Sequence, residues 1–243
     1  MSTSPNTLIL TAHGSKDPRS AANARALAAR LQRMRPGLDV RLAFLELSEP
    51  NFIDVLTGLP DGHPAVVTPL LLASAYHARI DIPEQISRAG VGYIRQADVL
   101  GEDDRLVLVL RERLAELHVS PFDRQLGVVV VAIGSSDSAV NARTAQVATK
   151  LAAETRWSGA TMAFATGPQP SVADAARQLQ RRGARRIVIA PWFLAPGRIT
   201  DRVWKYACDN GIPMAQPLGA HGLVAHTVLD RFDRALAADP AAA

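Results

Sequence analysis

Short apolar runs alternate with amphipathic segments along the whole chain. The first run, residues 8–12, is followed by residues 19–34, in which alanine and leucine recur at helical spacing. Further apolar runs and helical patterns follow in alternation, the runs at 40–45, 65–72 and 94–99 and the helices at 50–56, from 83 onward, and at 105–117. Continuous apolar strands that alternate with helices are typical of a parallel sheet covered on both faces, so the pattern predicts an α/β fold.

The same order of elements begins again at residue 126. The run at residues 126–133 leads into Gly134 and Ser135, as the first run leads into Gly14 and Ser15. Later strands recur at 161–164 and 187–194, with a period of roughly 110 to 120 residues. This recurrence indicates two tandem similar βαβα units, each a small parallel sheet flanked by helices. We predict that the units comprise residues 1–120 and 121–243.

Three reactive side chains follow predicted strands of the first unit: His13, Glu46 and His77. Ligands of open α/β sheets bind outside the carboxyl ends of the strands, and neighbouring strands lie only about 4.8 Å apart. Two imidazoles and a carboxylate suit a divalent cation such as Fe²⁺, Co²⁺, Ni²⁺ or Zn²⁺. The same groups suit proton transfer near neutral pH, because a carboxylate can orient a histidine. The pattern therefore predicts a metal or proton-transfer site.

The second unit lacks these three reactive groups. Their counterparts at the repeat offset are, in order, Ile133, Thr166, and Gly197 or Arg198. Residues that served only the fold would be expected in both units. We therefore expect residues 1–120 to carry the metal site and residues 121–243 to be a repeat unit that keeps the scaffold without the histidines.

The composition narrows the class of protein. A hydrophobic fraction of 48% and a charged fraction of 21% fit a globular protein, and the single cysteine, Cys208, excludes a cysteine metal cluster. No run approaches the roughly 18 apolar residues of a membrane span, and residues 1–6 lack the basic and apolar regions of a secretory signal. We expect a cytoplasmic protein that does not engage a membrane.

The charge is unevenly distributed between the predicted units. Residues 1–120 carry a net charge of −1 and residues 121–243 carry +5. The basic half suits either an acidic small-molecule partner or a simple solubility bias. Aromatic residues make up 5% of the chain and no helix-turn-helix or RNA-binding signature is present, so no nucleic-acid partner is expected.

Several motifs that would indicate other chemistry are missing. The sequence has neither Gly-x-Gly-x-x-Gly nor Gly-x-x-x-x-Gly-Lys-[Ser/Thr], so no nucleotide cofactor is expected. It also has no Gly-x-Ser-x-Gly hydrolase elbow. His13 follows Ala12 rather than an arginine, which argues against a histidine phosphatase. Two further histidines, His221 and His226, lie near the start of the last predicted helix without an assignable role.

Three segments together resemble the sirohydrochlorin chelatases. They are Leu10-Thr-Ala-His13-Gly-Ser-Lys-Asp-Pro18, Ala43-Phe-Leu-Glu46, and Tyr76-His77-Ala-Arg-Ile-Asp-Ile-Pro83. These class II chelatases insert Co²⁺ or Fe²⁺ into sirohydrochlorin on the way to cobalamin or sirohaem, and the resemblance is to their two-unit form. It implies a bilobal α/β enzyme with the tetrapyrrole between the units. In such an enzyme His13 and His77 would bind the incoming metal and take up pyrrole protons, and Glu46 would act as ligand, proton acceptor or orienting carboxylate.

The resemblance also implies contacts to the tetrapyrrole and a minimal set of partners. We expect the macrocycle to be held by Gly14, Ser15, Arg79 and Arg198, although the two arginines could instead form salt bridges with Asp81 or Asp201. The divalent metal, Fe²⁺ or Co²⁺, is a substrate and no nucleotide is needed. The internal repeat lets one chain form the cleft, so a monomer is possible, and the sequence does not determine the oligomeric state. A non-catalytic carrier of metal or tetrapyrrole and a phosphate-ester hydrolase are the alternative functions. The sequence does not choose between iron and cobalt.

Overall fold

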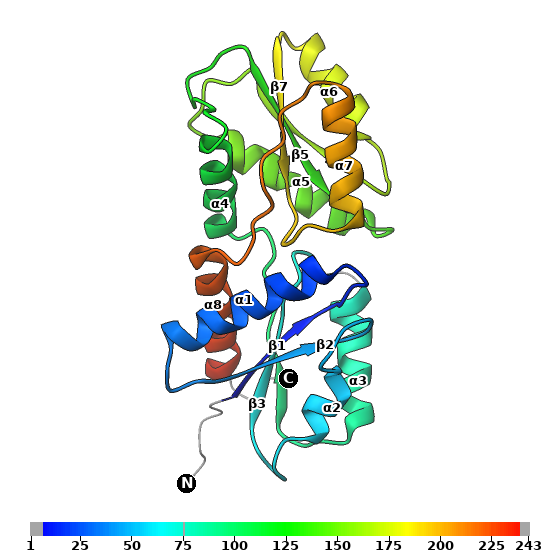
Figure 1. The fold of residues 1–243 in the computed structure, drawn as a ribbon, viewed down its shortest axis with the longest axis vertical. Helices are drawn as coiled ribbons and strands as arrows, with labels where there is room; N and C mark the ends of the chain where they lie inside the picture. The colour runs from blue at the N-terminus through cyan, green and yellow to red at the C-terminus, as the bar shows by residue number, and fades with distance from the viewer. Residues whose placement is uncertain (1–6, 75, 239–243) are drawn as a thin grey trace. The chain divides into compact units, whose positions relative to one another are not determined.

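The computed structural model describes residues 7–74 and 76–238, which form two compact units (Figure 1). Unit 1 comprises Met1–Gly101 and Ala220–Ala243, and unit 2 comprises Glu102–Gly219. Each unit has a parallel sheet flanked by helices, which confirms the predicted α/β class. The N-terminal segment for which the sequence predicts no secretory signal lies outside the described residues. No helix within the described part of the chain is long and apolar enough to cross a bilayer.

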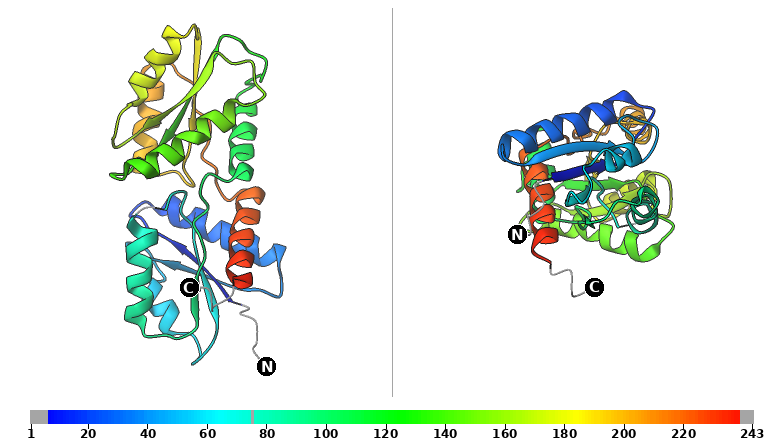
Figure 2. Two further views of the ribbon diagram at one scale, coloured as in Figure 1. Left: turned by 180° about the vertical axis from the view of Figure 1, so that it is seen from behind. Right: turned by 90° about the horizontal axis from the view of Figure 1, so that it is seen from below.

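Unit 1 is built around a four-stranded sheet with the order β2-β1-β3-β4. Its strands are β1 (Thr7–Ala12), β2 (Asp39–Phe44), β3 (Ala65–Pro69) and β4 (Ile94–Gln96). Its helices are α1 (Pro18–Met34), α2 (Phe52–Thr57), a π-helical turn η1 (His77–Asp81), α3 (Ile82–Ala89) and α8 (Gly222–Ala237). Helices α2 and α3 cover the face of the sheet that carries Ile9 and Val67. Helices α1 and α8 lie side by side and contact β2 and β3 (Figure 2).

Unit 2 repeats this plan with a three-stranded sheet in the order β6-β5-β7. Its strands are β5 (Leu126–Ala132), β6 (Gly159–Phe164) and β7 (Arg186–Pro191). Its helices are α4 (Asp104–Ala115), α5 (Ser138–Ala152), α6 (Val172–Arg181) and α7 (Arg198–Asp209). Strand β5 is buried along its whole length because helices cover both faces of the sheet, which explains its uninterrupted valine run.

The units differ from the predicted division at residue 120 because two helices are exchanged. Helix α4 follows β4 in sequence but packs in unit 2 against α5 and β7, and α8 follows unit 2 in sequence but packs in unit 1 against α1 and β3. Arg231 of α8 donates from Nε to Val99 O at 3.0 Å and from Nη2 to Leu100 O at 2.9 Å. An amphipathic pattern shows that a helix covers a sheet but not which sheet it covers.

The loops at the carboxyl edges of the two sheets follow the same path, which supports the predicted equivalence of positions. In unit 1 the amide of Glu46 donates to His13 O at 3.0 Å, and in unit 2 the amide of Thr166 donates to Ile133 O at 3.0 Å. Asp17 and Asp137 each cap the following helix through a side-chain oxygen. His13 and Glu46 therefore stand at backbone positions that the fold builds equally well with isoleucine and threonine.

Candidate active site

Backbone contacts bring the loop after β1 against the loop after β2. The amide of Leu45 donates to Ala12 O at 3.0 Å, one step before the bond between Glu46 and His13. Gly14 has a φ of +95°, and a Cβ atom built on it would lie 1.7 Å from Glu46 O. A side chain is excluded at this position, since real Cβ atoms do not approach a backbone oxygen so closely. The glycine after His13 is therefore what allows Glu46 to lie beside the histidine.

The three predicted reactive side chains meet at the carboxyl edge of unit 1. The rings of His13 and His77 have their centroids 4.1 Å apart and their planes tilted by 41°. Nδ1 of His13 lies 3.4 Å from Oε1 of Glu46. The His13 side chain is 39% exposed and that of His77 is 41% exposed, so the pair is open to solvent.

The two ring nitrogens of His13 have different surroundings. Nδ1 is buried and makes no hydrogen bond to any of the described residues, although the Glu46 carboxylate is near. Nε2 is therefore the ring nitrogen through which a partly exposed His13 can meet a ligand. Within residues 7–74 and 76–238, no group of three His, Cys, Asp or Glu side chains is already arranged around one metal position.

His77 lies on a helical turn rather than in the loop that the sequence predicts. Residues 77–81 form the π-helical turn η1, which runs directly into α3. On this turn Nδ1 of His77 contacts Oδ2 of Asp81, four residues further along the chain. From the sequence, Asp81 is expected only as a salt-bridge partner of Arg79. In a helical segment the spacing His-x-x-x-Asp indicates such a pair, because residues four apart share a helix face.

Gly14 and Ser15 have contacts that recur in unit 2, where no histidine follows the strand. The Ser15 hydroxyl accepts a hydrogen bond from the amide of Asp17 at 3.0 Å, and Ser135 accepts one from Asp137 at 3.1 Å. A Cβ on Gly134 would lie 2.0 Å from a backbone oxygen, as on Gly14. Gly14 and Ser15 thus shape the loop of unit 1 as Gly134 and Ser135 shape that of unit 2. The contact of Gly14 and Ser15 with a tetrapyrrole stays a prediction.

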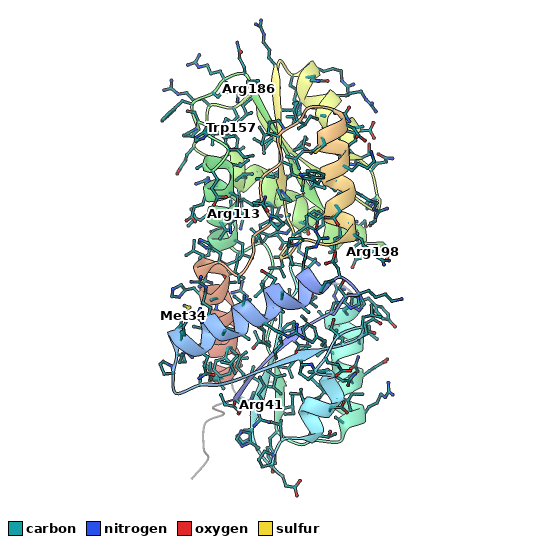
Figure 3. All side chains as sticks on the ribbon, viewed as in Figure 1. Met34, Arg41, Arg113, Trp157, Arg186 and Arg198 are labelled. Atoms are coloured by element: carbon teal, nitrogen blue, oxygen red, sulfur yellow. The ribbon has the colours of Figure 1, made fainter. Side chains whose placement is uncertain are left out.

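The arginines expected to hold the macrocycle lie in different units. Arg79 lies on η1, and its Nε donates to the Ser74 hydroxyl at 3.4 Å. Arg198 is the first residue of α7 in unit 2, at the end of that unit opposite Arg186 (Figure 3). The salt bridge of Arg186 is with Asp123, at 2.8 Å. A role for Arg79 or Arg198 in tetrapyrrole binding remains a prediction.

Part of the basic charge of the second half lies away from the carboxyl edge of its sheet. Four exposed arginines surround the end of α6 and the amino end of β7: Arg181, Arg182, Arg185 and Arg186. They lie at the amino end of a parallel strand, whereas ligands of such sheets bind at the carboxyl ends. This placement fits a solvated surface better than a tetrapyrrole site.

The two histidines without an assigned role both belong to α8. His221 is the N-cap of this helix, and its Nδ1 accepts a hydrogen bond from the amide of Leu223 at 3.2 Å. A side-chain acceptor at this position satisfies one of the free amides of the first turn. His226 lies on the exposed side of α8. His221 is therefore explained by the start of the helix.

Fold and site together define a two-unit α/β protein with a histidine–carboxylate centre at the carboxyl edge of the first sheet. The family model CbiX matches the chain twice, over residues 7–117 and again over residues 127–235. The chain therefore belongs to the CbiX family. The double match agrees with the internal repeat found in the sequence.

Curated relatives of this chain are named as chelatases. It is 27% identical over 234 residues to a sirohydrochlorin ferrochelatase of Priestia megaterium, with 90% of this chain and 86% of the relative covered. It is 26% identical to a sirohydrochlorin ferrochelatase of Bacillus subtilis, with 92% and 89% covered. A sirohydrochlorin cobaltochelatase of Priestia megaterium is also 26% identical, with 81% and 66% covered. These names do not favour the carrier or the phosphate-ester hydrolase.

Solved structures share the fold. SirB from Bacillus subtilis with Fe³⁺ matches with a TM-score of 0.81 at 23% identity, covering 95% of each chain. CbiX, described as the terminal enzyme for biosynthesis of siroheme in denitrifying bacteria, matches with a TM-score of 0.71 at 25% identity, covering 95% of this chain and 99% of that one. The two-unit architecture is thus found in other proteins over almost the whole chain.

Proposed function

We propose that this chain inserts a divalent metal, Fe²⁺ or Co²⁺, into sirohydrochlorin. The observation that carries the proposal is the pair of imidazole rings 4.1 Å apart, with Glu46 beside His13 and Asp81 beside His77. Unit 2 has isoleucine and threonine in place of His13 and Glu46 on the same backbone, so the fold requires neither His13 nor Glu46. The names of the curated relatives support the same reaction.

The chemistry of insertion explains why such residues are useful. A hydrated cation must exchange water for pyrrole nitrogens, and the macrocycle must release two N–H protons for each divalent ion it takes up. An imidazole nitrogen holds such a cation without the closed four-ligand shell that would trap it. A neutral histidine also accepts a proton near neutral pH, and a nearby carboxylate stabilises the charged ring.

We assign the steps to residues as follows. His13 and His77 receive the cation through the ring nitrogens that do not face a carboxylate, and deliver it to the macrocycle at the open edge of unit 1. As the metal leaves, the same rings accept the pyrrole protons, and Glu46 stabilises the protonated form of His13 from 3.4 Å. Nitrogen and carboxylate donors accept both iron and cobalt, so the choice of metal depends on geometry and supply.

The test is a metal-competition assay with purified protein, sirohydrochlorin, and Fe²⁺, Co²⁺ or Ni²⁺ without oxygen. We expect the absorption spectrum to change to that of the metallated product with iron or cobalt. A His13→Ala variant should fold and lose this activity, whereas His118→Ala, on an exposed surface of unit 2, should behave like the parent. An unchanged spectrum with both Fe²⁺ and Co²⁺ would contradict the proposal. Binding of sirohydrochlorin without turnover would instead support a carrier. Phosphatase activity that survives metal removal would support an ester hydrolase.

We further propose that the reaction needs no nucleotide and that the protein acts as a monomer in the cytoplasm. Chelation of a divalent ion involves no phosphoryl transfer, and one chain supplies both histidines and their carboxylates. Rates that are equal with and without ATP, and a molecular mass of one chain in solution, are the expected results.

A further inference from the structure

The turn that carries His77 is π-helical, so its backbone hydrogen bonds span one residue more than those of the regular helix α7, which matches it in unit 2. Sheet register makes Pro69 and Pro191 equivalent, since each is the last residue of its strand and pairs with the central strand at the same level. Ala78 lies nine residues after Pro69, Thr200 lies nine residues after Pro191, and both are buried. These two positions are therefore equivalent as well.

The next buried position differs between the units. In unit 1 it is Ile82, four residues after Ala78, and in unit 2 it is Val203, three residues after Thr200. The extra residue lies within η1, and in unit 2 the segment is the regular helix α7. A single inserted residue is what forms a π-bulge, and such bulges are often found at functional sites.

The insertion coincides with the contact between His77 and Asp81. By the equivalence of the buried positions, His77 matches Ile199 rather than the Gly197 or Arg198 expected from the sequence, and Asp81 matches Arg202. Histidine, carboxylate and extra residue thus occur together in unit 1, and none of them stands at the matching positions of unit 2, where the first-turn carboxylate of α7 is Asp201, one residue before Arg202.

We propose that Asp81 is a positioning residue, which holds His77 through Nδ1 and leaves Nε2 as the metal-binding nitrogen. This inference rests on the proposed function of the site. A neutral histidine that donates Nδ1–H to a carboxylate carries its lone pair on Nε2, and the contact fixes both the tautomer and the ring orientation. Nδ1 of His13 is already buried beside Glu46. Both rings then present Nε2 to the same cation.

The first test compares Asp81→Ala with Glu84→Gln, which removes an exposed carboxylate three residues away on α3. We expect Asp81→Ala to weaken Co²⁺ binding, measured by calorimetry without the macrocycle, by about 10–100-fold, as is usual when the partner of a ligating histidine is lost. The KM for the metal should rise while the KM for sirohydrochlorin stays constant. Asp81→Glu should restore part of the affinity, and Glu84→Gln should match the parent.

A second readout separates positioning from stability. NMR of protein labelled with ¹⁵N-histidine should show the His77 ring of the parent as the Nδ1–H tautomer. The His77 signals are assigned as those that disappear in His77→Gln. In Asp81→Ala we expect the Nε2–H tautomer to dominate at an unchanged melting temperature. An unchanged tautomer and an unchanged Co²⁺ affinity would overturn the inference. If the parent binds Co²⁺ in a manner that depends on Asp81 but never metallates sirohydrochlorin, the proposed function fails and the positioning role stands.

Deleting Ile80 tests the extra residue itself. Its side chain is 39% exposed, and the deletion gives unit 1 the three-residue spacing between buried positions that unit 2 has. We expect the variant to fold, to lose the contact between His77 and Asp81, and to bind Co²⁺ as weakly as Asp81→Ala. Affinity equal to that of the parent in a folded variant would show that the π-helical turn is not needed. If the deletion unfolds the chain, the Asp81 variants decide the question.

Discussion

Gly14 determines how closely the two loops of the site approach each other. Its φ of +95° and the 1.7 Å between a built Cβ and Glu46 O mean that any side chain must push the loops apart. Gly134 has the same conformation in unit 2, at 2.0 Å from Gly167 O. The same substitution can therefore be made at Gly14, beside the reactive side chains, and at Gly134, where those side chains are absent.

We predict that Gly14→Ala and Gly134→Ala both destabilise the protein, by about 1–3 kcal/mol, because each forces a strained backbone to move. Only Gly14→Ala should also reduce the rate of metal insertion, since it displaces Glu46 from His13. Chemical denaturation gives the stabilities, and the sirohydrochlorin assay gives the rates. Equal losses of activity in the two variants would contradict a role for the loop contact in the reaction.

The sequence predicts the reactive residues better than it predicts the residues that hold them in position. His13, Glu46 and His77 could be found because each follows an apolar run, and the carboxyl ends of parallel strands meet at one edge. The sequence does not indicate Asp81 as the partner of His77, because it predicts that the helix begins near Pro83, whereas helical structure already includes residues 77–81. A π-helical turn has no simple sequence pattern.

At the scale of elements, α6 begins with a capping box. The Ser171 hydroxyl donates to Asp174 Oδ2 at 2.6 Å, and the Asp174 amide donates to the Ser171 oxygen at 3.2 Å. Arg177 also donates to Asp174, at 2.6 Å. The bond from Ser171, and then that from Arg177, lowers the pKa of the Asp174 carboxyl below its ordinary value of 3.8. The folded state therefore favours the ionised form.

This direction gives a prediction for acid stability. A carboxyl group whose pKa is lowered by folding stabilises the protein above its unfolded pKa, and the effect is lost as the pH falls through the folded pKa. The melting temperature of Asp174→Asn should thus be below that of the parent near neutral pH and approach it as the pH falls below 3.8. The difference in melting temperature caused by Asp174→Asn should be smaller in a Ser171→Ala background. A melting-temperature difference between Asp174→Asn and the parent that stays constant from neutral pH to pH 3 would contradict the prediction.

Element types are predicted well, and element ends less well. The predicted strands at 65–72 and 94–99 end at Pro69 and Gln96, because an apolar run continues after the chain leaves the sheet. Leu70, just beyond β3, is still buried, at 5% exposure. Burial alone therefore extends an apolar pattern past the last residue of a strand.

At the scale of the whole molecule, the exchanged helices make the units unequal. Unit 2 is one continuous segment, whereas unit 1 needs α8 from the far end of the chain. Helix α8 buries Val224, Val228, Leu229 and Phe232. Full burial of such side chains contributes about 1.5–3 kcal/mol each, which is large beside the roughly 5–15 kcal/mol that stabilise a typical protein.

We predict that a chain ending at Gly219 loses the structure of unit 1 and keeps that of unit 2. Hydrogen exchange should be fast in β1 and β3 and slow in β5 of the shortened protein. The segment Glu102–Gly219 expressed alone should show the same slow exchange in β5. Full protection of β1 in the shortened chain would show that α8 is dispensable.

The exchange also sets the order in which the protein becomes complete during synthesis. The sheet with the histidines leaves the ribosome before unit 2, but helix α8, which covers it, is made only after all of unit 2. At roughly 5–20 residues per second, the interval between Gly101 and Ala220 is on the order of ten seconds. Throughout that time β3 lacks α8, so the nascent first sheet exposes apolar surface that a chaperone could recognise.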